Sequence, residues 1–484
     1  MASQEVSVVR NLIRCVIVLS VTVAVLAGAY LILFFAPSQD SFEGVIFASL
    51  EPVDIKSVSV QNESGSFRFY FDFEEGGYVT DDIPPQIVDV DKLIDFLSNS
   101  AQIAALRTVT SGGDLKDFGL EPPYAIAQIE FFDEEPLRIS IGAMERISGH
   151  FYATVEGYDD VFIISKVIAA QFLLPKTQII SPFVTPPLAV TSPLSAIRNI
   201  TFTGGGLDSP VTIYATAGAD KNIALAAMSF GAATHIVHRV ATYQLDQAYG
   251  IQILGSLFEI TAVDILGYGF NDEEIASFGF DEPYMAIDYN MVNGVGAEER
   301  QMSLRFVDAG GGYFYAMLEG TGAVYLIERK PFLDIEYEKL LLRWFLTPFL
   351  MDLSSVTVEY PGSSFRFDID ASDPRNPAVY YDGEALDIDL FHTFFRLITS
   401  AGHDGAYLGA LSQPVEEQPQ LTITYDYLDP DKKPDVMTLF PGGVRRVNVF
   451  VNGLGEFAMR DMFVSRVREG ALSLISGNPV EENW

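Results

Sequence analysis

The chain has 484 residues, a length typical of about three domains, and 49% of them are apolar, which excludes wholesale disorder. The formal net charge is −35 and no run of Lys or Arg offsets it, so we expect no nucleic-acid partner, because such a field repels phosphate backbones. The one cysteine, Cys15, excludes an intrachain disulfide and favours a bacterial extracytoplasmic protein over a eukaryotic secreted one.

The first predicted element is a transmembrane helix at residues 15–35. These 21 residues carry no charge, and a helix of roughly 20 residues crosses a bilayer core. Arg10 and Arg14 precede the segment and acidic residues such as Asp40 follow it, so the positive-inside rule makes residues 1–14 a cytoplasmic tail. We therefore expect a single-pass protein of the cell membrane whose C-terminal domains are extracytoplasmic.

A cleaved signal peptide is the alternative to this anchor, with Ala27-Gly28-Ala29 as the cleavage site. The apolar run continues to Phe35, beyond the usual apolar region of about 7–15 residues in signal peptides, which favours a retained anchor. The sequence leaves cleavage and the oligomeric state open.

Internal repeats organise the rest of the chain. Residues 57–72 (SVSVQNESGSFRFYFD) and 355–370 (SVTVEYPGSSFRFDID) are identical at eight of sixteen positions without a gap. A second relation joins Phe118–Tyr124 (FGLEPPY) to Phe278–Tyr284 (FGFDEPY). Self-similarity of this kind predicts tandem copies of one structural unit.

We predict three such modules, at residues 51–193, 194–352 and 353–484, the third being a degenerate copy without a clear Phe-Gly-x-x-x-Pro motif. A Pro-rich passage between the first two, with Pro182, Pro186 and Pro187 among its prolines, is predicted to be a short stiff connector.

Each module is predicted to be an antiparallel sheet with one or two helices, which is an α+β fold. In module 1, Phe67, Phe69 and Phe71 alternate as on one face of a strand, and apolar residues at helical spacing predict a helix over 91–106. Further strands are predicted at Tyr124–Phe132, Leu137–Ile141, His150–Val155 and Val161–Ile164.

The Phe-Gly motif is predicted to end a short helical turn. Asp114 can cap the turn, Gly119 suits a left-handed residue at its end, and Pro122 prevents continuation. We therefore expect positive φ at Gly119 and at its counterpart Gly279, and a role in folding rather than in chemistry.

No catalytic motif is present. The sequence contains neither a nucleophile elbow nor a phosphate-binding loop. His235 and His238 could approach one metal if helical, but no cysteine or acidic cluster completes a zinc set, and the many paired acids single out no glycosidase pair. We accordingly assign no catalytic, cofactor-binding or metal-binding residue, and we expect a protein that is not an enzyme and has no cofactor.

Two further groups have both a structural and a functional interpretation. The acidic run Asp426, Asp429, Asp431 and Asp435 lacks the spacing of an EF-hand, so we favour a solvated loop and leave weak calcium binding open. Four tyrosines recur at matched places in modules 1 and 2, and we favour core packing over a ligand groove for them. These are Tyr124, Tyr152, Tyr284 and Tyr315.

The ordered set of motifs resembles the bacterial domain of unknown function 4340 family. It is carried by Asp114–Pro123, Phe151–Ala153 and Val161–Ile164, and it recurs at Glu274–Pro283, Phe314–Ala316 and Val324–Ile327. The resemblance implies an envelope protein with one N-terminal anchor, and some members of the family are auxiliary to ABC transporters of the gliding-motility type. The family supplies no catalytic residues.

Three functions follow as expectations. The first is a membrane-anchored extracytoplasmic scaffold or partner-binding protein of the bacterial envelope, auxiliary to such an ABC transporter. The second is an array of ligand-binding modules for a cell-wall glycan or peptide, which a groove of exposed aromatic side chains would favour. The third is a hydrolase, which clustered acids with shifted pKa values in a cleft would favour.

Overall fold

The computed structural model describes residues 44–484 apart from 75, 81–82, 110–112, 374 and 406. The predicted tail at 1–14 and the predicted transmembrane helix at 15–35 lie outside these residues. Within the described residues, no helix combines the length and apolar character needed to cross a bilayer. The chain forms two compact units: the first includes Asp91–Gln178 and the residues up to Asp81, and the second comprises Asp82–Val90 and Ile179–Trp484.

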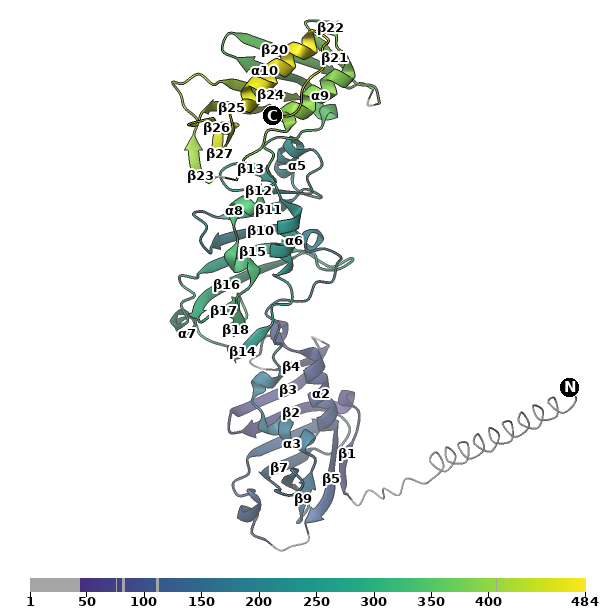
Figure 1. Ribbon diagram of the computed structural model, residues 1–484. Helices are drawn as coiled ribbons and strands as arrows, with labels where there is room; N and C mark the ends of the chain where they lie inside the picture. Colours follow the sequence, from purple (N-terminus) through teal and green to yellow (C-terminus); the bar gives the residue numbers. More distant parts are fainter. Residues whose placement is uncertain (1–43, 75, 81–82, 110–112, 374, 406) are drawn as a thin grey trace, which may run out of the picture. The chain divides into compact units, whose positions relative to one another are not determined.

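Three antiparallel sheets of nine strands each form the modules (Figure 1). The first sheet contains β1 (Ile46–Ser49), β2 (Ile55–Asn62), β3 (Gly65–Asp72), β4 (Gly77–Thr80), β5 (Gln102–Val109), β6 (Ala125–Phe131), β7 (Leu137–Met144), β8 (Phe151–Val155) and β9 (Val161–Ile164). The second contains β10 (Ile197–Gly204), β11 (Val211–Ala215), β12 (His235–His238), β13 (Thr242–Gln244), β14 (Ala262–Gly267), β15 (Met285–Met291), β16 (Arg300–Gly310), β17 (Tyr313–Leu318) and β18 (Val324–Glu328). The third contains β19 (Leu353–Tyr360), β20 (Ser363–Asp370), β21 (Ala378–Tyr381), β22 (Glu384–Ala385), β23 (Tyr407–Ser412), β24 (Leu421–Tyr427), β25 (Asp435–Pro441), β26 (Arg446–Val451) and β27 (Leu454–Arg460).

Eight of the nine strands follow one order in all three sheets. The orders are β4-β3-β2-β6-β7-β8-β9-β5, β12-β11-β10-β15-β16-β17-β18-β14 and β21-β20-β19-β24-β25-β26-β27-β23. The ninth strand differs, because β1 pairs beside β5 whereas β13 and β22 extend the opposite edge. The predicted tandem sheet modules are therefore confirmed, and the degenerate third copy keeps the topology of the other two.

The central strands show why these sequences form half-buried sheets. Strands β6, β15 and β24 occupy the same place in their sheets, and in each of them buried and half-buried residues alternate from end to end. Successive side chains of a strand point to opposite faces, so this alternation gives each sheet one face that packs on a core.

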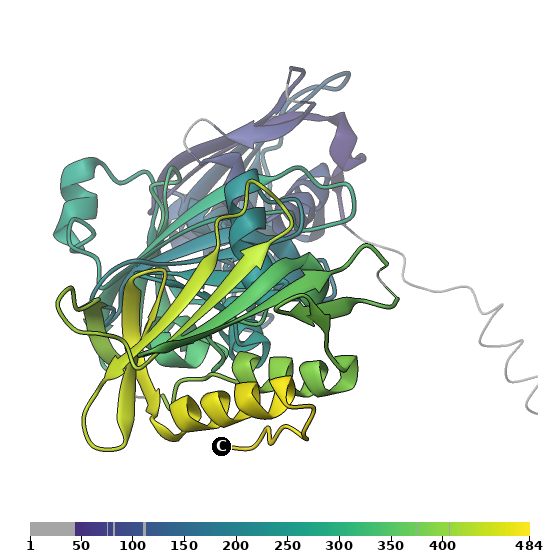
Figure 2. The same cartoon turned by 90° about the horizontal axis from the view of Figure 1, so that it is seen from above.

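Nine helices lie within the described residues. They are α2 (Val90–Ala101), α3 (Lys166–Leu173), α4 (Pro193–Ala196), α5 (Lys221–Ala227), α6 (Gln247–Gly255), α7 (Asp272–Ser277), α8 (Tyr337–Leu340), α9 (Ile388–Thr399) and α10 (Met462–Ile475). In the third module, α9 and α10 pack against each other (Figure 2). Helices α2 and α9 pack on their sheets through equivalent phenylalanines. The ring of Phe96 in α2 lies 5.3 Å from that of Phe69 in β3, and the ring of Phe394 in α9 lies 5.4 Å from that of Phe367 in β20.

The helix predicted over 91–106 is too long at its C-terminal end. Helix α2 ends at Ala101, and the residues after it form β5. Ile103 and Ala105 alternate as buried residues of this strand, which pairs with β1 and β9. A short run of apolar residues is compatible with the spacing of either a helix or a strand. Here β1 and β9 provide strand partners, so the run forms a strand.

The Phe-Gly motif ends a helical turn in both modules that carry it, as predicted. Gly119 has φ 66° and follows the 3₁₀ turn Leu115–Phe118, which Asp114 caps by accepting a hydrogen bond from the Lys116 backbone N–H. Gly279 has φ 91° and follows α7. Glycine is favoured at both positions because other residues seldom adopt positive φ.

The Pro-rich passage, predicted to be a short stiff connector, forms hydrogen bonds with the second module. The carbonyl oxygen of Pro182 accepts a hydrogen bond from the Ala262 N–H at 2.7 Å, and that of Pro187 accepts one from Asn293 Nδ2 at 2.8 Å. These bonds hold the passage along an edge of the second unit.

Candidate functional site

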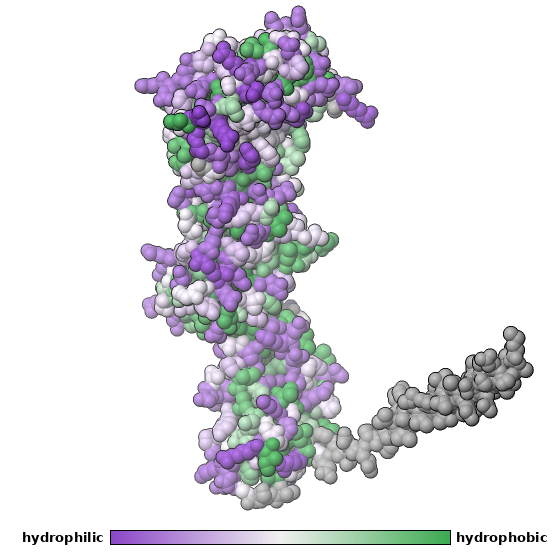
Figure 3. Space-filling model, viewed as in Figure 1, coloured by the Kyte–Doolittle hydropathy of each residue, from purple (hydrophilic) through white to green (hydrophobic). Residues whose placement is uncertain are grey.

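A groove that contains several arginines lies on the third module. It has a volume of about 1200 Å³ and is lined by residues from the β25–β26 turn, the end of β27, the first turns of α10 and the β19–β20 turn. Four arginines contribute to its wall: Arg445, Arg446, Arg460 and Arg468. In the view of Figure 3, hydrophilic side chains cover much of this module.

Two of these arginines are held side by side by the sheet. Arg446 opens β26, Arg460 closes β27, and the two are direct partners in the antiparallel register. Like charges directly opposite each other destabilise a sheet. Arg446 forms an ion pair with Asp404, whereas no described carboxylate lies within ion-pair distance of Arg445, Arg460 or Arg468. The groove lining therefore combines four arginines with two carboxylates, Asp404 and Asp461, which leaves a formal excess of positive charge.

The start of α10 also lines the groove. Asp461 occupies the N-cap position without a side-chain hydrogen bond to the helix, and Met462, Val464 and Ser465 of the first turns line the groove. The N-terminal end of a helix carries a partial positive charge from its unpaired N–H groups. The Asp461 carboxylate offsets this partial charge, so the preference of the groove for a negatively charged ligand rests on the arginine side chains.

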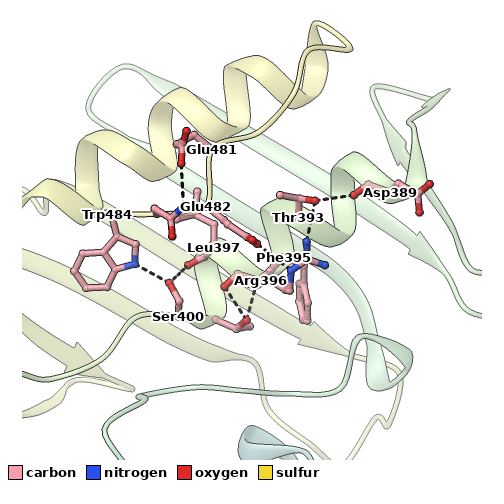
Figure 4. Close-up of polar contacts among 11 residues, drawn as sticks. Asp389, Thr393, Phe395, Arg396, Leu397, Ser400, Glu481, Glu482 and Trp484 are labelled. Carbon is pink, nitrogen blue, oxygen red and sulfur yellow. Dashed lines mark hydrogen bonds and ion pairs between the residues drawn. The ribbon is translucent and has the colours of Figure 1, made fainter.

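The C-terminal segment is tied to α9 (Figure 4). The indole N–H of Trp484 donates to Ser400 Oγ at 2.7 Å, and Arg396 pairs with Glu482 at 3.0 Å. The Trp484 ring also packs on Phe463, with centroids 5.0 Å apart. Phe463 is buried and lies between Met462 and Val464, which line the groove, so these contacts anchor the start of α10.

A second polar cluster is buried where the second and third modules meet inside the second unit. Asp435 is 1% exposed and accepts hydrogen bonds from Ser229 Oγ and from the Tyr427 hydroxyl, both at 2.6 Å, and from Asn452 Nδ2 at 2.9 Å. The ammonium group of Lys432 lies 3.0 Å from the same carboxylate and donates to Ser229 Oγ at 2.8 Å. A small cavity of about 150 Å³ adjoins this cluster.

The chemistry of this cluster is that of a structural link. Ser229 Oγ donates a hydrogen bond to Asp435, and Lys432 pairs with the same carboxylate, so both side chains are engaged in holding the cluster together. Burial and the neighbouring Asp435 carboxylate raise the pKa of Tyr427 above its ordinary range. A buried charge with every partner in place joins the modules and fixes their orientation.

Glu456 and His403 form another buried part of the same junction. Glu456 accepts a hydrogen bond from the Tyr337 hydroxyl at 2.8 Å, and burial raises the pKa of its carboxyl group. The His403 imidazole stacks on Phe457 with centroids 4.5 Å apart, and burial lowers its pKa to about 4. Both groups are therefore favoured in their uncharged forms.

The histidines and aspartates considered from sequence do not assemble a metal site. His235 and His238 lie in the strand β12 rather than in a helix, and the first is buried while the second is exposed. Among the residues that the structure describes, no group of three potential ligands could hold a metal ion. Of the acidic run, Asp435 is part of the junction, so the prediction of a solvated loop is wrong for that residue.

The four tyrosines are divided between packing and exposure. Tyr152 and Tyr315 are half-buried against the Phe-Gly motif, with centroids 4.8 Å from Phe118 and 5.3 Å from Phe278. Tyr284, also half-buried, lies 5.4 Å from Phe314. Tyr124 is 54% exposed, so the core-packing interpretation is wrong for it.

An exposed aromatic cluster lies on the first module. Phe71 contacts Phe73, Tyr78 and Phe132 with centroids 5.1, 5.3 and 6.1 Å apart. Phe73 is 79% exposed and Phe132 is 40% exposed. These rings offer an apolar surface to a flat partner.

The arginine groove was not found from sequence. The net charge of the chain gave no indication of this groove, because 65 acidic and 30 basic residues suggest a uniformly acidic surface. The signal was the concentration of arginines in 445–468, where Arg446 and Arg460, fourteen positions apart, become cross-strand neighbours through the β26–β27 hairpin. Comparisons of the chain with family models, with curated proteins and with solved structures found no match in any of the three.

Proposed function

We propose that this chain is a membrane-anchored partner-binding protein of the bacterial envelope, with its N-terminus in the cytoplasm and its three modules outside. The uncharged segment at 15–35 and the resemblance to the family of domain 4340 support this location. The association of some family members with ABC transporters of the gliding-motility type makes such a transporter the first partner to test. The protein acts by binding and carries out no chemistry of its own.

The observation that carries the proposal is the arginine groove of the third module. In a chain of net charge −35, guanidinium groups that lack a carboxylate partner are costly to bring together, and surface arginines are ordinarily dispersed. Arginine recognises carboxylates through two parallel hydrogen bonds and is enriched at binding interfaces. An acidic partner would offset the repulsion between Arg446 and Arg460 that the sheet imposes.

The test is co-purification of the full-length chain from membranes, followed by identification of the proteins that accompany it. The double variant Arg460→Glu/Arg468→Glu should lose the partner. The control is Arg375→Glu, which makes the same type of substitution once, at an exposed position beyond the far end of β20 from the groove. Equal recovery of the same partners with all three proteins contradicts the proposal.

The location has its own test. Protease added to intact cells or protoplasts should digest residues 51–484, because the arrangement of Arg10 and Arg14 before the apolar segment places these residues outside. Full protection of that region would show that the orientation is wrong.

Binding of a cell-wall glycan is the second candidate, and the aromatic cluster of the first module favours it. Exposed rings such as Phe73 can stack on the apolar faces of sugars. Sedimentation of the protein with purified cell walls should then be lost in Phe73→Ala and kept in Arg460→Glu. The reverse result would favour the groove as the site.

A further inference from the structure

We propose that the groove of the third module binds an extended segment of a partner protein in which acidic and apolar side chains are mixed. This inference rests on the proposed partner-binding function and adds the chemistry of the partner.

The spacing of the positive charges favours a ligand with several anionic groups. From Asp461 to Arg468, α10 contributes about two turns to the groove, which is roughly 10 Å at 1.5 Å per residue. An extended peptide spans that length with about three residues. One compact anion contacts only part of a groove of that length, whereas carboxylates along an extended peptide can meet Arg445, Arg460 and Arg468 separately.

Apolar side chains lie between the arginines. Val444 is 91% exposed and Met462 is 46% exposed, and both line the groove together with Tyr360. The guanidinium of Arg468 lies 5.9 Å from the centroid of the Tyr360 ring, which keeps that ring at the groove wall. A purely anionic polymer leaves this surface in water, whereas a peptide with apolar side chains buries it and gains the hydrophobic contribution. Methionine adapts its shape to varied partners.

The charge of the rest of the protein limits the length of the ligand. A net charge of −35 repels any long polyanion that extends beyond the groove. A short acidic segment on an otherwise mixed partner avoids that repulsion. The combination of local positive charge, apolar wall and surrounding negative field therefore favours an acidic–apolar peptide over a phosphate polymer.

The experiment measures binding of fluorescent peptides to the full-length protein in detergent micelles at low and moderate salt. The main probe alternates Glu and Leu over seven residues. A second probe has Ser in place of Leu, a third has Gln in place of Glu, and inorganic tripolyphosphate serves as competitor. We expect the Glu/Leu probe to bind, the Glu/Ser probe to bind at least about tenfold more weakly, and the Gln/Leu probe not to bind.

Variants locate the interaction. Arg460→Glu should weaken binding of the Glu/Leu probe by about tenfold or more, since a hydrogen bond to a charged group contributes roughly 1.5–3 kcal/mol. Val444→Ser should weaken binding of the Glu/Leu probe and leave binding of the Glu/Ser probe unchanged. Arg375→Glu should change the binding of neither probe. All of these positions are at the surface, so the variants should fold.

The outcomes separate the two proposals. Equal binding of the Glu/Ser and Glu/Leu probes, or stronger competition by tripolyphosphate than by unlabelled Glu/Leu peptide, would overturn the peptide inference while leaving an anion site. If Arg460→Glu/Arg468→Glu loses the membrane partner but the wild type binds none of the peptides, the proposed function is supported and this inference is rejected. Peptide binding that is insensitive to Arg460→Glu overturns the inference as well.

Discussion

Replacement of Asp435 by alanine should strongly destabilise the second unit. The carboxylate is buried at the junction of the second and third modules, where Ser229, Tyr427 and Asn452 donate to it and Lys432 pairs with it at 3.0 Å. Asp435→Ala leaves a buried ammonium group without its counter-ion and leaves three donors without their acceptor. Removing one partner of a buried ion pair costs about 3–5 kcal/mol, which is a large part of the roughly 5–15 kcal/mol that stabilise a domain.

The chain offers a built-in probe for this measurement. Its two tryptophans, Trp344 and Trp484, both lie in the second unit, so their emission during urea unfolding reports on that unit alone. The double variant Lys432→Met/Asp435→Asn removes both charges and keeps an acceptor for the hydroxyl groups, so it should cost less than Asp435→Ala alone.

Asp431→Ala is the matched control in the same loop. Asp431 pairs with Lys221, and both side chains are exposed, so solvent screens the pair and its loss should leave the unfolding midpoint close to that of the wild type. The reasoning is refuted if Asp435→Ala shifts the midpoint no more than Asp431→Ala does.

Four further predictions concern the Phe-Gly motif and the titratable groups of the junction. Gly119→Ala should lower the thermal stability of the first unit, because a Cβ at φ 66° would meet the backbone N of Ala143 at 2.9 Å, and calorimetry of the full chain should show this as a shift of one transition. Phe118→Ala should cost about 3–5 kcal/mol in urea unfolding followed by circular dichroism, because it opens a cavity beside β8, and loss of partner binding without loss of stability would contradict a folding role. His403 has a lowered pKa in the fold, so its contribution to stability is present above its unfolded pKa and is lost as pH falls from about 6.5 towards 4. In His403→Gln, the free energy of unfolding measured by tryptophan emission should depend less on pH in that range. Glu456 has a raised pKa, so the stability of the wild type should fall as pH rises through that pKa. Glu456→Gln cannot ionise, so this fall in stability should be absent in the variant.

Much of the fold could be predicted from local patterns. The alternation of Phe67 and Phe69 and the repeat at 355–370 predict equivalent strands, and the structure places Val58 opposite Phe69 and Val356 opposite Phe367. The left-handed glycines of the Phe-Gly motif were also predictable, because only glycine adopts that conformation without strain. These features depend on residues close together in sequence.

The candidate site could not be predicted in the same way, because it depends on contacts between distant residues. Arg446 and Arg460 are neighbours only after the β26–β27 hairpin forms, and Asp435 meets Ser229 only after two modules pack together. The helix boundary at Ala101 was missed for the same reason, since strand partners for the following residues are supplied by β1 and β9. Local propensity is overridden where tertiary pairing provides a better alternative.

Site-specific photocrosslinking in intact cells tests the central claim most directly. A photoreactive amino acid at Val444, an exposed residue of the groove, should capture a membrane or envelope protein, and the crosslinked peptide should contain acidic and apolar residues. The same amino acid at Val295, an equally exposed position in the second module, should capture little, and Arg460→Glu should abolish the adduct at Val444. Equal crosslinking from both positions, or an adduct at Val444 that survives Arg460→Glu, would contradict the account of the groove as the partner-binding site.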